Sequence, residues 1–261
     1  MRMHHERLGE GVPLLLVHGL GSTWRTWAPV LDGLSARREV IVVDLPGFGE
    51  TPPLSGDLTI AALADALTTF IDDHGLTGVD LVGSSVGARL VLELARRGVG
   101  GDTVALDPGG FWSPMQKRAF QVSIGTSIRL VRALQPALPL LTSHPVGRTA
   151  LLAQLSSRPW ALPQELVLRE LQSWAGSAGY DSLLDALVHG PDQQGAPVGS
   201  TPGRVVIGWG RQDRVVTPAQ AAAAMARFPG AELHWFDRCG HFPMWDQPQE
   251  TIRLILGNTA V

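Results

Sequence analysis

The sequence of 261 residues is poor in cysteine, because Cys239 is the only one. A single cysteine excludes an internal disulfide and any metal site built from several thiolates. Long apolar runs are also missing, and none approaches the length that crosses a bilayer. Residues 1–11 are too polar for a secretory signal peptide. We therefore expect a cytoplasmic protein.

An excess of basic residues is missing too. The chain carries 21 Lys and Arg against 24 Asp and Glu, for a formal net charge of −3 at pH 7. This balance provides no basic stripe, so neither a nucleic acid nor an anionic membrane is indicated as a partner. Apart from the neighbouring His4 and His5, no histidine pair has metal-ligand spacing with a carboxylate nearby, so no metal is expected.

The sequence is, in contrast, rich in short apolar runs that alternate with helical patterns. Hydrophobic residues make up 44% of the chain, enough for one large core. Strands separated by helices pair in parallel, so the pattern predicts an α/β fold with a mostly parallel, doubly wound sheet. The predicted strands are 12–17, 40–43, a run from Val79, 103–106, 204–207 and 231–236; the predicted helices between or after them include 24–34, 59–74, 219–227 and 248–256.

Residues 112–197 break this alternation, since they contain helical patterns and prolines but no convincing strand. We predict an α/β core formed by residues 1–111 and 198–261, with 112–197 inserted as a helical cap. Such an insertion can cover a pocket or form a dimer surface, so the oligomeric state stays open. The predicted helices of the insertion are 115–134, 136–156, 163–176 and 180–189.

The most informative stretch is Gly83-Ser84-Ser85-Val86-Gly87, which joins an apolar strand to a helix. A serine between such glycines fits a sharp, strained turn that exposes its hydroxyl. The helix that follows directs its first N–H groups toward the space beside that hydroxyl, where an oxyanion would form. The pattern therefore predicts a serine nucleophile at Ser85.

A serine nucleophile needs a base and a carboxylate that orients the base. His241 follows a predicted strand in a glycine-containing loop with apolar neighbours. Asp213 follows the preceding strand, which gives the chain order Ser, Asp, His of the nucleophile-elbow class. Asp107 also follows a strand directly and is the competing carboxylate. We favour Asp213 because its loop matches the class better.

Five loops that follow predicted strands together resemble the α/β-hydrolase fold family, in the capped branch that includes esterases and carbon–carbon bond hydrolases. The resemblance covers nearly the whole chain. It is carried by His18-Gly19-Leu20-Gly21, Asp44-Leu45-Pro46-Gly47-Phe48-Gly49, Gly83-Ser84-Ser85-Val86-Gly87, Gly210-Arg211-Gln212-Asp213 and Gly240-His241-Phe242-Pro243-Met244-Trp245.

The resemblance implies that Ser85 is the nucleophile, His241 the general base and acid, and Asp213 the residue that orients it. It also implies an oxyanion hole made by the backbone N–H groups of Leu20 and Val86, without a cofactor.

Aromatic side chains are candidates for an apolar substrate pocket, among them Trp24, Trp112 and Phe242. We therefore predict a serine hydrolase that cleaves a neutral, fairly apolar ester, thioester or lactone through an acyl-enzyme. The alternative is a hydrolase that cleaves a carbon–carbon bond in a diketone. A lyase or a ligand-binding protein on the same fold is the third possibility.

Overall fold

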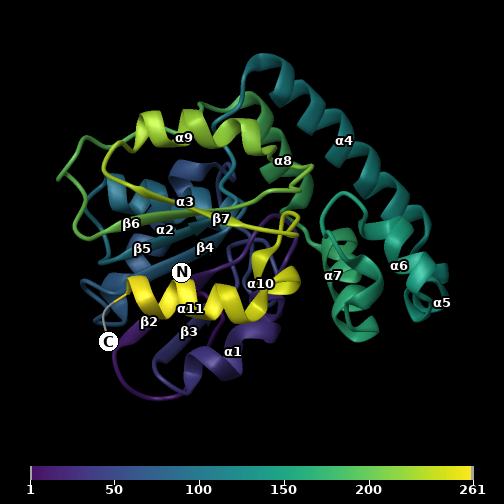
Figure 1. Cartoon of the computed structure of the whole chain (residues 1–261), viewed down its shortest axis with the longest axis horizontal. Coiled ribbons are helices and arrows are strands. Elements are labelled where there is room, and N and C mark those ends of the chain that lie inside the picture. The colour runs from purple at the N-terminus through teal and green to yellow at the C-terminus, as the bar shows by residue number, and fades with distance from the viewer. Residues whose placement is uncertain (1, 260–261) are drawn as a thin grey trace.

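The computed structural model describes residues 2–259 and contains a seven-stranded sheet between two layers of helices (Figure 1). The strand order across the sheet is β1-β3-β2-β4-β5-β6-β7, and every neighbouring pair except β1 with β3 is parallel. The predicted α/β class with a mostly parallel sheet is confirmed. The strands are β1 (His5–Leu8), β2 (Pro13–Val17), β3 (Glu39–Val43), β4 (Asp80–Ser84), β5 (Thr103–Leu106), β6 (Val205–Gly210) and β7 (Glu232–Phe236).

Strand β1 is absent from the prediction. It consists of four residues, none of them β-branched, and it pairs antiparallel with β3 at the edge of the sheet. Glu6 and Arg7 in its centre are exposed. An edge strand with polar, exposed side chains lacks the apolar pattern by which the buried strands are found.

Helices cover both faces of the sheet, as Figure 1 shows. α1 and α11 pack against each other on one face, and α2 and α3 do so on the other. The helical elements outside residues 114–189 are η1 (Trp24–Trp27), α1 (Ala28–Ser35), α2 (Ile60–Asp73), α3 (Val86–Arg96), η4 (Pro218–Gln220), α9 (Ala221–Arg227), α10 (Pro243–Asp246) and α11 (Pro248–Asn258).

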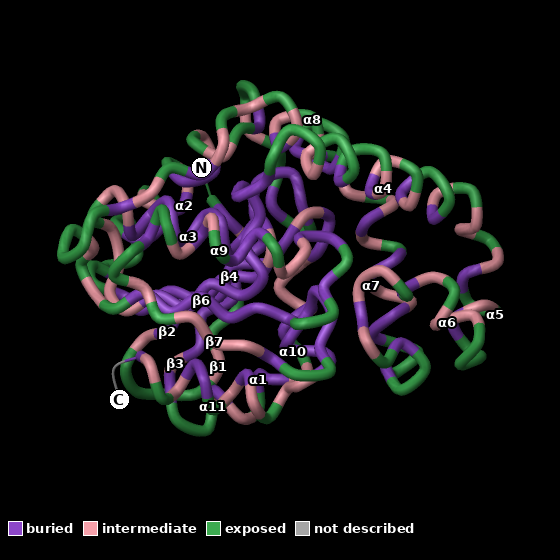
Figure 2. The backbone as a smooth tube through the Cα atoms, turned by 45° about the horizontal axis from the view of Figure 1, so that its top comes forward, coloured by how far each residue is buried: buried purple, intermediate pink, exposed green. Residues whose placement is uncertain are grey.

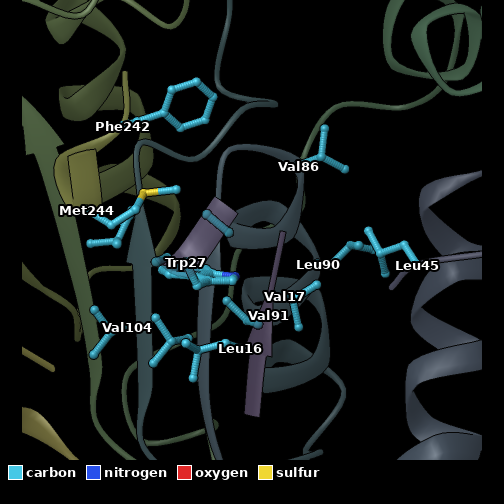
Figure 3. Close-up of a cluster of buried hydrophobic side chains, with 14 of the residues drawn as sticks. Leu16, Val17, Trp27, Leu45, Val86, Leu90, Val91, Val104, Phe242 and Met244 are labelled. Atoms are coloured by element: carbon cyan, nitrogen blue, oxygen red, sulfur yellow. The ribbon is translucent and has the colours of Figure 1, made fainter. Parts of the chain in front are cut away.

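The core includes the central strands and the face of α3 that packs on them. All five residues of β4 are buried, as are the four residues of β5, because helices cover both faces of these strands. Figure 3 shows side chains of β2, β5 and α3 converging on Trp27, with Val86 and Phe242 at one end of the cluster. This packing holds the ends of the strands, and the loops after them, in fixed relative positions.

Five further helices separate β5 from β6 and lie beside the sheet at one end of the molecule (Figures 1 and 2). We call them the inserted helices. A break at His144 divides the predicted helix 136–156, because Pro145 begins a new helix there. Their elements are α4 (Pro114–Ala133), η2 (Gln135–Ala137), α5 (Leu138–Ser143), α6 (Pro145–Leu152), η3 (Pro159–Ala161), α7 (Gln164–Gly176) and α8 (Tyr180–His189).

The boundaries of the predicted cap, 112–197, enclose all the inserted helices, and the division into core and cap stays a prediction. Within residues 2–259, no helix combines the length and the apolar character that crossing a bilayer requires.

Candidate active site

Ser85 lies in a strained turn between β4 and α3, with φ 57° and ψ −113°. The turn depends on close backbone approaches at both flanking glycines. A Cβ on Gly83 would lie 2.2 Å from the carbonyl oxygen of Gly87, and one on Gly87 would lie 2.0 Å from the carbonyl oxygen of Val17. Only glycine fits at either position, so the two glycines make the turn possible.

The register of the sheet brings the candidate polar residues together. Ser84 pairs with Leu106, and Leu106 pairs with Gly208. The residues that follow these three strands therefore lie at the same edge of the sheet, which is where parallel sheets build their sites.

His241 lies between the serine and an aspartate. Its Nε2 is 2.8 Å from Ser85 Oγ, and its Nδ1 is 2.7 Å from Asp213 Oδ2. His241 and Asp213 are buried. Asp213 is held by the backbone, since its Oδ1 accepts hydrogen bonds from the N–H groups of Val215 and Val216. The imidazole is thus oriented with one nitrogen toward the hydroxyl and one toward a fixed carboxylate.

The competing carboxylate, Asp107, lies next to this pair, but the hydrogen-bond partners of the imidazole are Ser85 and Asp213. Its Oδ1 accepts a 2.8 Å hydrogen bond from the N–H of Gly210. Burial, together with the neighbouring Asp213 carboxylate, raises the pKa of Asp107 well above its ordinary value. Burial and the neighbouring carboxylate therefore both favour the neutral form of Asp107.

Two backbone N–H groups near the serine have no partner in the described part of the chain. Within residues 2–259, the N–H of Leu20 has no hydrogen-bond acceptor, and the N–H of Val86 is the first of α3 and has no partner inside the helix. Both residues line the same cavity as Ser85. Unpaired N–H groups at a helix start beside a nucleophile are suited to hold an oxyanion.

Above Ser85 and His241 lies a mostly apolar cavity with about 80 Å³ of free space. No Arg, Lys, Asp or Glu is among its lining residues in the described part of the chain. Five of its lining residues come from α4, and α7 and α8 contribute one each. The side chains from these three helices are Phe120, Ile124, Ser127, Ile128, Val131, Trp174 and Tyr180.

Of the predicted aromatic pocket residues, Phe242 lines this cavity and two others do not. Trp112 packs on Phe120 with ring centroids 4.9 Å apart, and its indole N–H donates to Asp192. Trp24 packs against the core, with the Arg25 guanidinium over its ring. The apolar residues of α4 that line the cavity recur at helical spacing, and the sequence contains that signal. Spacing alone, however, does not tell that this face of the helix is directed toward the active site.

A buried carboxyl group on α7, Glu170, is a feature that sequence analysis missed. Its Oε2 accepts a 2.8 Å hydrogen bond from Ser22 Oγ, and the indole N–H of Trp174 donates to the same hydroxyl. Burial raises the pKa of Glu170 to about 7, although hydrogen bonds from Ser22 and other donors act in the opposite direction. Isolated in the sequence, Glu170 resembles an ordinary surface residue of a helix.

Asp107, Asp213 and His241 also lie close enough together to hold a metal ion. Both imidazole nitrogens are, however, occupied by protein partners, Ser85 and Asp213. We therefore derive no metal chemistry from this group.

A mostly parallel sheet with a serine at a strained strand-to-helix turn, followed in the chain by an aspartate and a histidine that contact each other, defines the class of α/β hydrolases. The comparison with protein families agrees: residues 14–254 match the alpha/beta hydrolase family, and the chain belongs to it. The protein is a hydrolase.

The relatives of this chain carry the names of different activities. The chain is 28% identical over 263 residues to the dihydrolipoyllysine-residue acetyltransferase component of the acetoin cleaving system of Cupriavidus necator. That match covers 96% of this chain but only 64% of the relative, so the chain spans less than two thirds of its length. It is 26% identical over 270 residues to a 2-hydroxy-6-oxononadienedioate/2-hydroxy-6-oxononatrienedioate hydrolase of Dechloromonas aromatica, covering 98% and 90% of the two chains.

Among solved structures, the fold is similar to that of a thermophilic esterase from Thermogutta terrifontis. The TM-score is 0.76 at 22% identity, with 98% of this chain and 92% of that chain covered. At this identity the likeness shows the fold alone.

Proposed function

We propose that the protein is a serine hydrolase that cleaves a neutral, fairly apolar ester, thioester or lactone through an acyl-enzyme. The observation that carries the proposal is the continuous contact from Ser85 Oγ through the imidazole of His241 to Asp213, at the floor of an apolar cavity. In this proposal the inserted helices act as the cap of the active site.

In the first half-reaction Ser85 Oγ attacks the carbonyl carbon and its proton passes to His241 Nε2. The oxyanion that forms is held by the N–H groups of Leu20 and Val86. Collapse of the tetrahedral intermediate breaks the bond to the leaving group, which takes the proton from His241. Water then repeats these steps on the acyl-enzyme and releases the acid. Asp213 keeps the imidazole in the tautomer that accepts at Nε2.

The lining of the cavity supports an uncharged substrate. A charged carboxylate in an apolar cavity needs a cationic partner to offset the cost of losing its hydration. Neither Arg nor Lys lines this cavity.

The test is hydrolysis of p-nitrophenyl acetate and butyrate by the purified chain. Replacement Ser85→Ala should abolish p-nitrophenol release, whereas Ser84→Ala should retain it, because Ser84 is a buried neighbour outside the cavity lining. A fluorophosphonate probe should label the wild type and not the Ser85→Ala variant. Ester hydrolysis that survives Ser85→Ala overturns the proposal, because the nucleophile would then lie elsewhere. A wild type that resists the probe also overturns it and favours a binding role.

The second candidate is hydrolysis of a carbon–carbon bond, which is favoured by the likeness to the dienedioate hydrolase over 98% of this chain. A dioate carries two carboxylates, and the cavity offers them no cationic side chain. Comparing kcat/KM for a diketo acid with kcat/KM for p-nitrophenyl butyrate separates the two activities. Faster turnover of the diketo acid would favour the second.

A further inference from the structure

Acidic residues are absent from a long internal stretch of the chain. The 57 residues 108–164 contain six Lys and Arg but no Asp or Glu. The other 204 residues contain 15 basic and 24 acidic residues. The net charge of −3 therefore combines a segment of +6 with a remainder of −9, and the whole-chain balance hides a strongly basic region.

The basic segment includes α4, whose two faces differ. Phe120, Ile124 and Ile128, spaced four residues apart, point inward and line the cavity. Met115, Val122 and Arg129, spaced seven residues apart, lie on the opposite face of the helix. Met115 is 80% exposed and Val122 is 60% exposed. α4 thus has one apolar face toward the substrate cavity and a second face toward solvent that mixes apolar and cationic residues.

The other exposed apolar side chains gather in the same region. Of the eight large hydrophobic residues that are exposed between residues 2 and 259, six belong to the basic segment. Figure 1 shows α4, α5 and α6 along the rim of the molecule that is farthest from the sheet, and Figure 2 shows their outward turns as exposed. The six are Met115, Val122, Leu130, Leu140, Val146 and Trp160.

Two exposed arginines of α4 have no acidic partner in the described part of the chain. Arg118 and Arg129 are exposed, and no carboxylate in residues 2–259 lies within ion-pair distance of either. Lys117 and Arg132, on the same helix, are paired with Asp192 and Asp181. The unpaired charges are therefore on the face that also carries Met115 and Val122, since Arg118 and Val122 are four residues apart.

We propose that the outer face of α4, with the exposed ends of α5 and α6, binds an anionic phospholipid surface. Apolar side chains gain free energy by entering the acyl boundary, and arginines beside them reach the phosphate groups with long side chains. A second copy of the chain fits less well, because a two-fold symmetric contact would bring the same cationic face against itself. The positive charge of this surface favours anionic phospholipids over neutral ones.

Binding in this orientation places the substrate cavity one helix diameter from the lipid. The residues that contact the headgroups and the residues that line the cavity belong to opposite faces of α4. An apolar ester dissolved in the lipid would then reach the cavity from the side of α4. The surface itself does not depend on catalysis, so it can be tested separately from the proposed hydrolase activity.

The experiment is flotation of the whole chain with vesicles at low ionic strength. Vesicles of equal parts phosphatidylglycerol and phosphatidylcholine should carry the protein, whereas vesicles of phosphatidylcholine alone should not. The double variant Arg118→Gln/Arg129→Gln should bind at least tenfold more weakly, since each arginine near an anionic surface contributes about fivefold. Met115→Ser/Val122→Ser should weaken binding at unchanged charge, and high salt should release the protein.

The matched control is Arg37→Gln/Arg253→Gln, which removes two exposed, unpaired arginines from the loop after α1 and from α11. It should bind the vesicles like the wild type. The proposal is overturned if the control loses as much vesicle binding as Arg118→Gln/Arg129→Gln, or if the wild type does not bind the anionic vesicles. So does self-association without lipid that Met115→Ser/Val122→Ser abolishes, because the surface then binds a second copy.

The variants tested for vesicle binding also distinguish lipid binding from the proposed hydrolase activity. All of them should hydrolyse a water-soluble ester at the wild-type rate, because none of the replaced residues lines the cavity. Ser85→Ala should lose hydrolysis and keep vesicle binding.

Discussion

Ser22 Oγ and Glu170 Oε2, 2.8 Å apart, join the loop after β2 to helix α7 of the insertion. The same helix contacts this loop again, because Ser173 Oγ donates a 2.6 Å hydrogen bond to the carbonyl of Gly21. Leu20, whose N–H is proposed to hold the oxyanion, belongs to this loop. Helix α7 therefore holds the loop that carries this proposed oxyanion donor.

The buried Glu170 should make stability depend on pH. Its pKa is raised to about 7, so the folded protein still holds a proton that the unfolded chain releases near the ordinary value of 4.5. The stability that this group contributes is complete below that ordinary value and is lost as the pH rises to about 7. Groups that face Glu170 lower its pKa and so partly offset this loss. Among them are the hydroxyl of Ser22 in the facing loop, the hydroxyl of Thr26 in η1 and the guanidinium of Arg169.

Urea denaturation of wild type and Glu170→Gln at about pH 5 and about pH 8 measures the effect. We expect the unfolding free energy of the wild type, relative to that of the variant, to be lower at the higher pH than at the lower pH. Glu165→Gln, on the exposed side of the same helix, is the control and should show no such difference. An identical pH dependence of wild type and Glu170→Gln would contradict the assignment.

The two carboxylates beside His241 should differ sharply in their effect on catalysis. Asp213→Asn removes the group that orients the imidazole and should lower kcat about 10³- to 10⁴-fold. Asp107→Asn should keep most of the activity, because Asp107 bonds the backbone N–H of Gly210 and not the imidazole. Steady-state kinetics on one ester compares them directly. A larger loss in Asp107→Asn would make Asp107 the triad carboxylate.

The length of the acyl chain should be limited by α4. The free space of about 80 Å³ is small for a ligand pocket. Ile124→Ala enlarges it, and we expect kcat/KM for an octanoate ester, relative to an acetate ester, to rise about tenfold. Val122→Ala, on the outer face of the same helix, is the control and should leave the ratio unchanged. A ratio that stays constant in Ile124→Ala would place the acyl chain elsewhere.

The approach of α3 to β2 should tolerate no side chain at Gly87. A Cβ there would lie 2.0 Å from the backbone oxygen of Val17, so Gly87→Ala should lower the unfolding free energy by about 3 kcal/mol. A Cβ on Gly125 of α4 would meet no atom within 4 Å, and Gly125→Ala should raise stability by about 0.5–1 kcal/mol. Thermal unfolding measures both, and equal melting temperatures would contradict the close approach.

The sequence alone determined the α/β class and the place of Ser85, because buried parallel strands and a glycine-flanked turn leave strong local patterns. It also indicated Asp213 and His241 as candidates, since each follows a strand whose carboxyl end belongs to one edge of the sheet. The polar edge strand β1 carries no such pattern and was missed.

Only the tertiary structure decided which carboxylate hydrogen-bonds to His241, because Asp107 and Asp213 both follow neighbouring strands directly and the local sequence does not distinguish them. It likewise decided that α4 lines the cavity, that Trp24 and Trp112 do not, and that Glu170 is buried against Ser22. Each of these depends on contacts between segments far apart in the chain, whereas a local sequence pattern reports only on neighbouring residues.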